Sequence, residues 1–192
     1  CSVQYFQMSK DISPPTKLLR LDLEFTDFDY PNACVLEVCV EVTDFNFVTL
    51  ASYEARIKNN PETLAKRLKL NTFWQDFPEN RDDFVNNNGK GKSLKRVENE
   101  LIAFVEEHFG KEPAILAGNS IHSDRQVVKA HWPVFDLKLH YRMLDVTSLK
   151  ILMQGKYGVE FDKKNTHRAY DDIQASIAEL QFYLDWFSKE HE

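Results

Sequence analysis

The segment Leu18-Leu19-Arg20-Leu21-Asp22-Leu23-Glu24-Phe25 places two carboxylates inside an apolar run. Side chains two residues apart on a strand point to the same face, so we expect Asp22 and Glu24 to lie side by side. Adjacent anions in apolar surroundings repel each other and lose hydration, which a fold tolerates when a cation lies between them. Hard divalent cations prefer carboxylate oxygens. The segment therefore indicates a metal site; the alternative it leaves open is an edge strand with two solvated acids.

The rest of the chain changes from a run of strands to alternating strands and helices. Period-two alternation and apolar runs predict strands, and capping residues with helical apolar spacing predict helices. Strands are expected over 16–26, 34–44, 48–57, 114–121 and 139–146, and helices from Asn60 onward and over 94–109, 123–131, 147–154 and 168–187. The polar stretch 77–92 is expected to be the least ordered. This order predicts an α/β fold with a mixed sheet flanked by helices.

Length, charge and cysteine content limit the class of protein. A chain of 192 residues suits one domain with a substantial core. A net charge of −6 argues against coating of long nucleic acids, and no apolar run approaches the roughly 18 residues of a membrane span. Cys1, Cys34 and Cys39 are odd in number and lack metal-ligand spacing, so we expect reduced thiols and a cytoplasmic protein, or a mitochondrial one if the source is eukaryotic.

The first residues look foreign to the domain. The run Gln4-Tyr5-Phe6-Gln7 before Met8 resembles the remnant of a protease-cleavage site, so residues 1–7 are interpreted as a probable expression-tag remnant. Residues 8–192 are then expected to form a single domain.

Two more carboxylates stand where chemistry is expected. Asp124 follows the predicted strand end Gly118-Asn119-Ser120 and opens a helix; strand ends are where α/β folds build sites, although an acid there also suits the helix dipole. In the last helix, the predicted buried stripe is Ala169, Ile173, Ile177, Leu180, Leu184 and Phe187. At about 100° per residue, Asp171 lies about 165° from this stripe and Asp172 about 95°. Helix phase therefore selects Asp172 for a cleft and leaves Asp171 in solvent.

Four segments in order carry a family resemblance: DLEFTDFD at 22–29, GNSIHSDR at 118–125, HYRMLDVTSLK at 140–150 and THRAYDDI at 166–173. Over roughly 17–187 the chain resembles the histidine-bearing branch of the DEDD 3′→5′ exonuclease superfamily, and more narrowly the oligoribonuclease family. The resemblance implies an RNase H-like fold with a five-stranded mixed sheet. It also implies a metal-dependent 3′→5′ exoribonuclease that hydrolyses short oligoribonucleotides, dinucleotides especially, to 5′-mononucleotides.

The resemblance also implies roles for the acidic residues and for one histidine. Two divalent ions, Mg²⁺ or Mn²⁺, would stabilise the charge that develops during phosphodiester hydrolysis. Asp22 would bridge them, Glu24 and Asp172 would complete one site, and Asp124 would support the other. His167 would act as the general base, since its ordinary pKa suits proton transfer near neutrality.

Substrate contacts are implied in the same way. Phe28 matches an apolar wedge between the bases, although a core phenylalanine is the alternative, and Trp74 matches a tryptophan at the 3′ base. The positions expected to grip the terminal phosphate of a short single-stranded RNA are Ser120, Arg142 and Thr147. Tyr141, and with it Arg142, would come from the second subunit of a homodimer.

One segment departs from the family pattern. The family usually carries Arg-Thr-His shortly after the tryptophan, whereas Gln75-Asp76-Phe77-Pro78-Glu79-Asn80 follows Trp74 here. The wall at one end of the substrate pocket is therefore expected to differ. Two alternatives stay open: a related DEDD exonuclease that acts on longer RNA or DNA 3′ ends, and a catalytically silent scaffold of the same fold.

Overall fold

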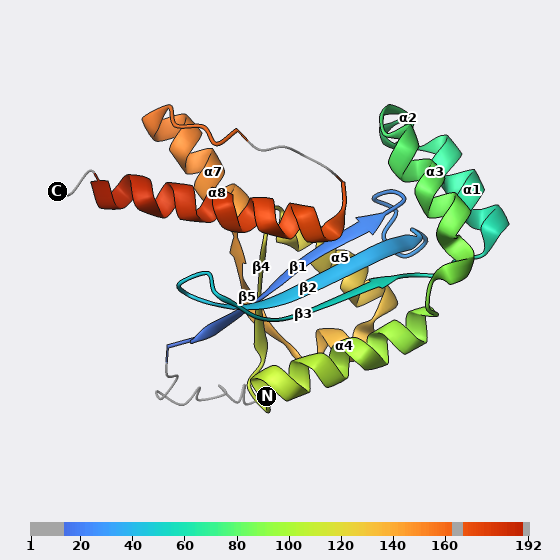
Figure 1. The fold of residues 1–192 in the computed structure, drawn as a ribbon, viewed down its shortest axis with the longest axis horizontal. Coiled ribbons are helices and arrows are strands. Elements are labelled where there is room, and N and C mark those ends of the chain that lie inside the picture. The colour runs from blue at the N-terminus through green and yellow to red at the C-terminus, as the bar shows by residue number, and fades with distance from the viewer. Residues whose placement is uncertain (1–13, 163–166, 190–192) are drawn as a thin grey trace, which may run out of the picture.

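A computed structural model describes residues 14–162 and 167–189, so the predicted remnant 1–7 and Met8 lie outside the described residues. Its centre is a five-stranded sheet of order β3-β2-β1-β4-β5 (Figure 1). The strands are β1 (Lys17–Phe25), β2 (Val35–Asp44), β3 (Thr49–Arg56), β4 (Ala114–Gly118) and β5 (Leu139–Asp145). β1 pairs antiparallel with β2 and parallel with β4, while β4 and β5 are parallel. The predicted mixed sheet is confirmed, and its architecture is RNase H-like.

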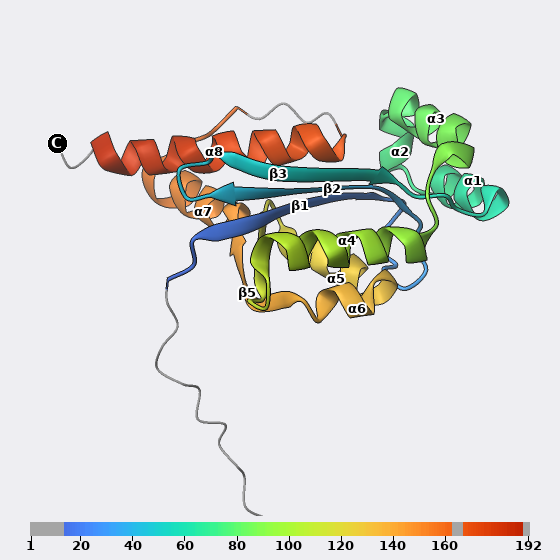
Figure 2. The ribbon, with the colours of Figure 1, turned by 60° about the horizontal axis from the view of Figure 1, so that its bottom comes forward.

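Helices cover both faces of this sheet. They are α1 (Pro61–Leu70), α2 (Phe73–Asp76), α3 (Pro78–Asn87), α4 (Leu94–Phe109), α5 (Ile121–His131), α6 (Pro133–Asp136), α7 (Val146–Leu152) and α8 (Ala169–Lys189). A 3₁₀ turn at Asn88–Lys90 follows α3, and a π turn at Met153–Tyr157 follows α7. Figure 2 shows α8 on one face and α4, α5 and α6 on the other. None of the helices in the described part of the chain has the length and apolar character needed to cross a bilayer.

Alternation along β1 divides its side chains between the two faces. Leu19, Leu21 and Leu23 enter the main core with α4 and α5. Asp22 and Glu24 point the other way, and their partners across the antiparallel pair are Cys39 and Glu37. Cys39 packs against the first turns of α8. The metal-binding candidates therefore lie on the central strand, under α8, and not on an exposed edge.

Two sequence-based predictions were wrong: one about secondary structure and one about which side chains of α8 are buried. The stretch 77–92 is helical over most of its length. Burial of Phe84 with Trp74 stabilises the helix and offsets the conformational entropy lost when this polar sequence becomes ordered. The buried stripe of α8 also shifts near its end: Tyr183 is fully buried, whereas the predicted Leu184 is 44% exposed and Phe187 is partly buried. Tyr183 is held there by a hydrogen bond from its hydroxyl to Glu179.

Candidate active site

The carboxyl end of β1 forms the floor of a cleft of about 510 Å³. The walls come from several elements: β1 and the loop after it, α2, α5, and α8 with the segment before it. The lining residues are Asp22, Leu23, Glu24, Phe25, Asp27, Phe28, Asn71, Phe73, Trp74, Ser120, His122, Ser123, Asp124, His167 and Asp172. The structure therefore brings together all four predicted metal ligands and His167.

Asp124 is fixed against β1 by the main chain. The amide of Leu23 donates to Asp124 Oδ1 at 3.0 Å, between the two strand carboxylates. This close approach depends on Gly118 at the end of β4, where a Cβ atom would lie 2.9 Å from the carbonyl oxygen of Leu21. The chain then turns through Ser120, in the left-handed region at φ 48°, and α5 begins.

The helix phase places the paired aspartates of α8 differently. Asp172 lines the cleft and is partly buried, while Asp171 is exposed. Ala169 and Ile173 lie one turn apart on the same face of α8 and pack on Cys39 of β2. This packing fixes the rotation of the helix about its axis. The predicted distinction between the neighbours agrees with this geometry.

The carboxylates of the cleft disfavour one another's charge. Burial, and then the charges of Asp22 and Asp172, raise the pKa of Glu24 well above its ordinary value. Burial, and then Asp22, raise the pKa of Asp124 well above its ordinary value, although the amide of Leu23 opposes the shift. No ion pair among the described residues involves Glu24 or Asp124. This arrangement suits a bound cation.

Three groups able to bind a cation lie close together in the cleft. One atom each from Glu24, His167 and Asp172 lie within 4.8 Å of one another. Two carboxylate oxygens and an imidazole nitrogen are donors that divalent metals accept. The residues present therefore fit the divalent metal that the exonuclease fold implies.

His167 occupies a constrained turn just before α8. Its φ of 52° is in the left-handed region, and its carbonyl accepts a hydrogen bond of 2.8 Å from the side chain of Asn80. Its ring lies 4.0 Å from the ring of Phe77 and 4.8 Å from that of Phe73, centroid to centroid. Two elements of the chain, α2 and the start of α3, thus hold the backbone and the ring.

A polar site borders the other side of the cleft, at the start of α5. The amide of Ser120 donates to Asp145 Oδ1 at 2.9 Å and to Thr147 Oγ1 at 2.8 Å, and the Ser120 and Thr147 hydroxyls are 3.2 Å apart. His122 Nδ1 lies 3.5 Å from Asp145. The two hydroxyls predicted to contact a terminal phosphate are therefore neighbours.

The two predicted base-contacting aromatic residues differ in exposure. Phe28 is 72% exposed at the mouth of the cleft, which excludes the alternative of a core phenylalanine. Trp74 lines the cleft but is only 1% exposed, and its indole N–H donates to the carbonyl of Thr26 at 3.2 Å. The Phe28 ring, in edge contact with Phe25 and Tyr30, is thus largely exposed to solvent, whereas Trp74 supports the wall.

Tyr141 and Arg142 lie away from this cleft on edge strand β5. Tyr141 is 62% exposed, and the guanidinium of Arg142 lies over its ring at 5.3 Å. Neither residue lines the cleft of its own chain.

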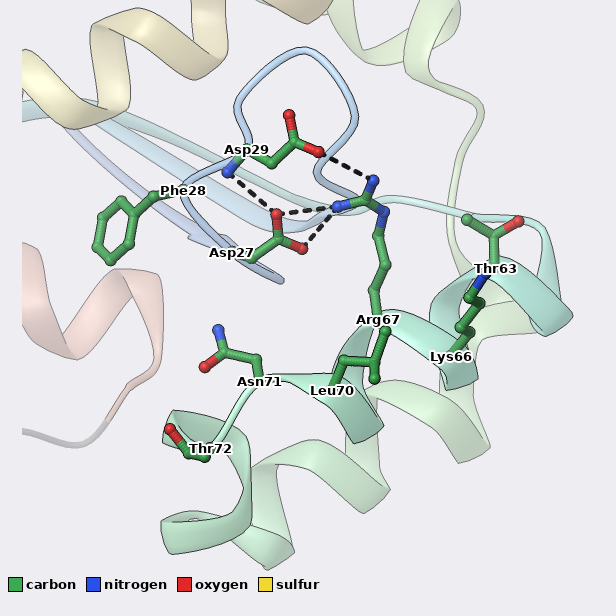
Figure 3. Close-up of a pocket in the computed structure, with 9 residues that line it drawn as sticks. All are labelled: Asp27, Phe28, Asp29, Thr63, Lys66, Arg67, Leu70, Asn71 and Thr72. Carbon is green, nitrogen blue, oxygen red and sulfur yellow. Dashed lines mark hydrogen bonds and ion pairs between the residues drawn. The ribbon is translucent and has the colours of Figure 1, made fainter.

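A second hollow of about 740 Å³ shares Asp27, Phe28 and Asn71 with the cleft (Figure 3). Arg67 of α1 crosses toward the loop after β1 and binds Asp27 at 2.9 Å and Asp29 at 3.3 Å. This ion pair ties the loop that carries Phe28 to α1.

Several residues in or beside the cleft were not predicted. Asp145 caps α7 through the amide of Thr147 at 3.0 Å, and an Asp before a predicted helix start is a signal that identifies such a residue. His122 stands in the GNSIHSDR segment and carried no separate signal. Phe77 and Asn80 depend on helices in the stretch 77–92, which the sequence pattern did not indicate.

Comparisons with known proteins agree with this geometry. An exonuclease family model, RNase_T, matches residues 19–180. An oligoribonuclease of Francisella tularensis subsp. tularensis (strain WY96-3418) is 35% identical over 172 residues, which cover 86% of this chain and 93% of the relative. An oligoribonuclease of Pseudomonas fluorescens (strain Pf0-1) is 35% identical over 187 residues, covering 91% and 98%.

Solved structures share the fold. Exonuclease I of E. coli, in complex with a 5cy-dA13 oligonucleotide, superposes with a TM-score of 0.56 at 11% identity and covers 91% of this chain. Exonuclease I of Methylocaldum szegediense gives 0.57 at 15% identity and covers 86%. The chain spans only 43% and 40% of those two proteins.

The fold and the carboxylate cleft thus define a nuclease of the divalent-metal-dependent 3′→5′ exonuclease class. Within that class, the chain belongs to the oligoribonuclease family.

Proposed function

We propose that this protein hydrolyses short single-stranded oligoribonucleotides, dinucleotides especially, from the 3′ end to 5′-mononucleotides. The single observation that carries the proposal is the cluster of Asp22, Glu24, Asp124 and Asp172 beside His167 in one cleft. The curated relatives, which match over nearly their whole length, are named oligoribonucleases and support RNA as the substrate.

The cleft carboxylates would hold two divalent ions, Mg²⁺ or Mn²⁺, with Asp22 shared, Glu24 and Asp172 in one site and Asp124 in the other. When bound, such ions stabilise developing negative charge on the attacking and leaving oxygens. The protein contributes a buried, rigid set of oxygen donors whose mutual repulsion favours cation binding.

His167 is proposed to accept the proton of the attacking water. Its ring packs against Phe73 and Phe77 and lies within 4.8 Å of the Glu24 and Asp172 carboxylates, which supports a role in proton transfer beside the bound ions. Phe28 stacks on a base at the mouth of the cleft. The hydroxyls of Ser120 and Thr147 bind the terminal phosphate at the other side, which limits the length of RNA that fits.

A homodimer completes the site in this proposal, with Tyr141 and Arg142 supplied by the second subunit. The edge strand β5 and its neighbours expose apolar side chains that a partner would bury: Leu137, Tyr141, Met143, Ile151 and Leu152. The proposed assembly places these residues at a shared interface, where Arg142 can bring a bidentate donor to phosphate.

The function is tested with 5′-labelled RNAs of graded length, from dinucleotides upward, in Mg²⁺, Mn²⁺ or EDTA. We expect the highest kcat/KM on dinucleotides, activity with either metal and none in EDTA. A preference for long RNA or for DNA would support the related exonuclease activity instead. No turnover of any RNA or DNA with either metal would identify a silent scaffold.

The shared site is tested by mixing two inactive variants, Tyr141→Ala and Asp124→Asn. Mixed dimers regain one intact site, so after random subunit exchange we expect about a quarter of wild-type activity. A monomer in sedimentation, or a mixture that stays inactive although subunits exchange, would refute the cross-subunit role of Tyr141.

A further inference from the structure

A network of two arginines and two carboxylates lies directly behind the cleft. Arg168, the residue after His167, binds Glu37 of β2 at 2.8 Å and Asp83 of α3 at 3.0 Å. Arg56 of β3 binds the same Asp83 at 2.6 Å and lies 3.6 Å from the same Glu37. Both guanidinium groups lie over the ring of Phe84, at 5.7 and 5.9 Å. The network therefore joins β2, β3, α3 and the segment that enters α8.

This network meets the cleft through the main chain around His167. The amide of Arg168 donates to Asp172 Oδ2 at 3.2 Å, and the amide of Asp172 donates to the carbonyl of Arg168 at 3.0 Å. Asn80, on the same helix as Asp83, donates to the carbonyl of His167 at 2.8 Å. The hydrogen bond from Asn80 anchors His167, whose φ is positive, a conformation that a non-glycine residue keeps only when its surroundings impose it. The two hydrogen bonds between Arg168 and Asp172 fix the segment that follows.

We propose that Arg168 and Asn80 are positioning residues, which hold His167 and Asp172 over the cleft by anchoring their segment to α3 and the sheet. The proposal rests on the function proposed above for His167. It assigns to helix α3, in the part of the chain that departs from the family pattern, a direct role in the geometry of the reaction.

Arginine suits this position because its planar fork reaches two carboxylates at once. The Nε and Nη2 atoms of Arg168 both bind Glu37, while Nη1 binds Asp83. A lysine there keeps the positive charge but not this geometry. Glu37 also lies opposite Glu24 in the strand pairing, so the positive charge of Arg168 offsets an anion that faces the metal-binding carboxylates.

Arg56 is the matched control for Arg168. Both arginines share Glu37, Asp83 and Phe84, and their side chains are 30% and 35% exposed, but Arg56 lies on β3 and does not precede α8. Arg168 donates three hydrogen bonds of this network, and Arg56 donates one and lies near Glu37. With a purely structural network, the loss of activity would follow the loss of melting temperature in the same way for both arginines.

The experiment compares Arg168→Met with Arg56→Met, and Asn80→Ala with Asn86→Ala, an exposed position on the same helix. Turnover of a 5′-labelled RNA dinucleotide is measured in Mn²⁺ together with the melting temperature of each variant. We expect Arg168→Met to lower kcat by about 10- to 100-fold with little change in KM, because a misplaced catalytic group costs rate more than binding. Asn80→Ala should lower kcat in the same way but less, and Arg168→Lys should recover part of the loss.

Arg56→Met and Asn86→Ala should retain kcat within about threefold, even where Arg56→Met lowers the melting temperature as much as Arg168→Met does. Equal kcat losses in Arg56→Met and Arg168→Met would overturn the positioning role, as would an Asn80→Ala enzyme with unchanged kcat. These outcomes presuppose an active wild-type enzyme. A wild type that cleaves no RNA refutes the proposed function instead, so the two failures are distinguishable.

Discussion

Two groups of carboxylates, one lining the cleft and one behind it, differ in what faces them. Glu37 and Asp83 each face two arginines, and the hydrogen bond from Arg56 is the main cause that lowers the pKa of Asp83. Glu24 and Asp124 face other acids, and burial raises the pKa of each well above its ordinary value. The first group stabilises the native fold by itself, whereas the second is complete only with a cation. Charge compensation by the protein therefore separates the acids paired with arginine from the candidate metal ligands.

The largest expected effect comes from removing one charge of the cleft group. Asp124→Asn or Asp172→Asn should lower kcat/KM on an RNA dinucleotide by about 100-fold or more, because metal ions supply several kcal/mol of transition-state stabilisation. Steady-state kinetics in Mg²⁺ and Mn²⁺ measure the loss, and circular dichroism checks that the fold is retained. Either variant with activity within tenfold of wild type would remove that residue from the metal site.

The next effect concerns the pH dependence of stability without metal. Because the folded-state pKa values of Glu24 and Asp124 are raised, the native state keeps protons that the unfolded state loses above its ordinary pKa values. In EDTA, these groups should make the free energy of unfolding fall as pH rises from about 5 toward the raised values, by about 1.4 kcal/mol per pH unit for each retained proton.

Urea unfolding at several pH values measures this slope. Asp124→Asn should flatten it, and Mg²⁺ or Mn²⁺ at neutral pH should restore stability to the wild type but less to the variant. Parallel slopes for wild type and variant would contradict the proposed repulsion.

The paired group should show a smaller effect of opposite sign. Asp83 has a lowered pKa, so its contribution to stability is present above the ordinary value of 3.8 and is lost as pH falls below it. Asp83→Asn should cost about 1 kcal/mol at neutral pH, a modest value because the pair is partly solvated. Metal-induced stabilisation, read from melting temperatures with and without Mn²⁺, should remain. Loss of metal-induced stabilisation in Asp83→Asn would show that the arginine-paired carboxylates and the cleft carboxylates depend on each other.

The smallest effect is expected at Asp171, the exposed neighbour of Asp172. Asp171→Asn should leave kcat/KM within about twofold and the unfolding free energy within about 0.5 kcal/mol. The same kinetic assay and urea titration apply. A loss comparable to that of Asp172→Asn would contradict the orientation of α8.

The strands and the carboxylates were predictable because they depend on short-range patterns. Alternation along β1 and β2 and the phase of α8 identified the elements and distinguished Asp172 from Asp171. Helix α3 was not predictable, because its polar sequence gains helical structure only from burial of Phe84 in contact with Trp74 and two arginines. The hydrogen bond that anchors His167 comes from the same helix, so this part of the site could not be predicted from the sequence either.

Phe84 and the helices around it occupy one continuous part of the sequence, and this has a consequence for how nucleases of this class can come to differ from one another. Asp22 and Glu24 belong to the central strand, whereas α1, α2 and α3 form one contiguous insertion between β3 and α4, at one end of the sheet (Figure 1). Exchange of that insertion between relatives would replace the cleft wall that Asn71, Phe73 and Trp74 line and leave the acids of β1 in place. Chimaeras at this junction therefore change the shape of the cleft without changing its carboxylates.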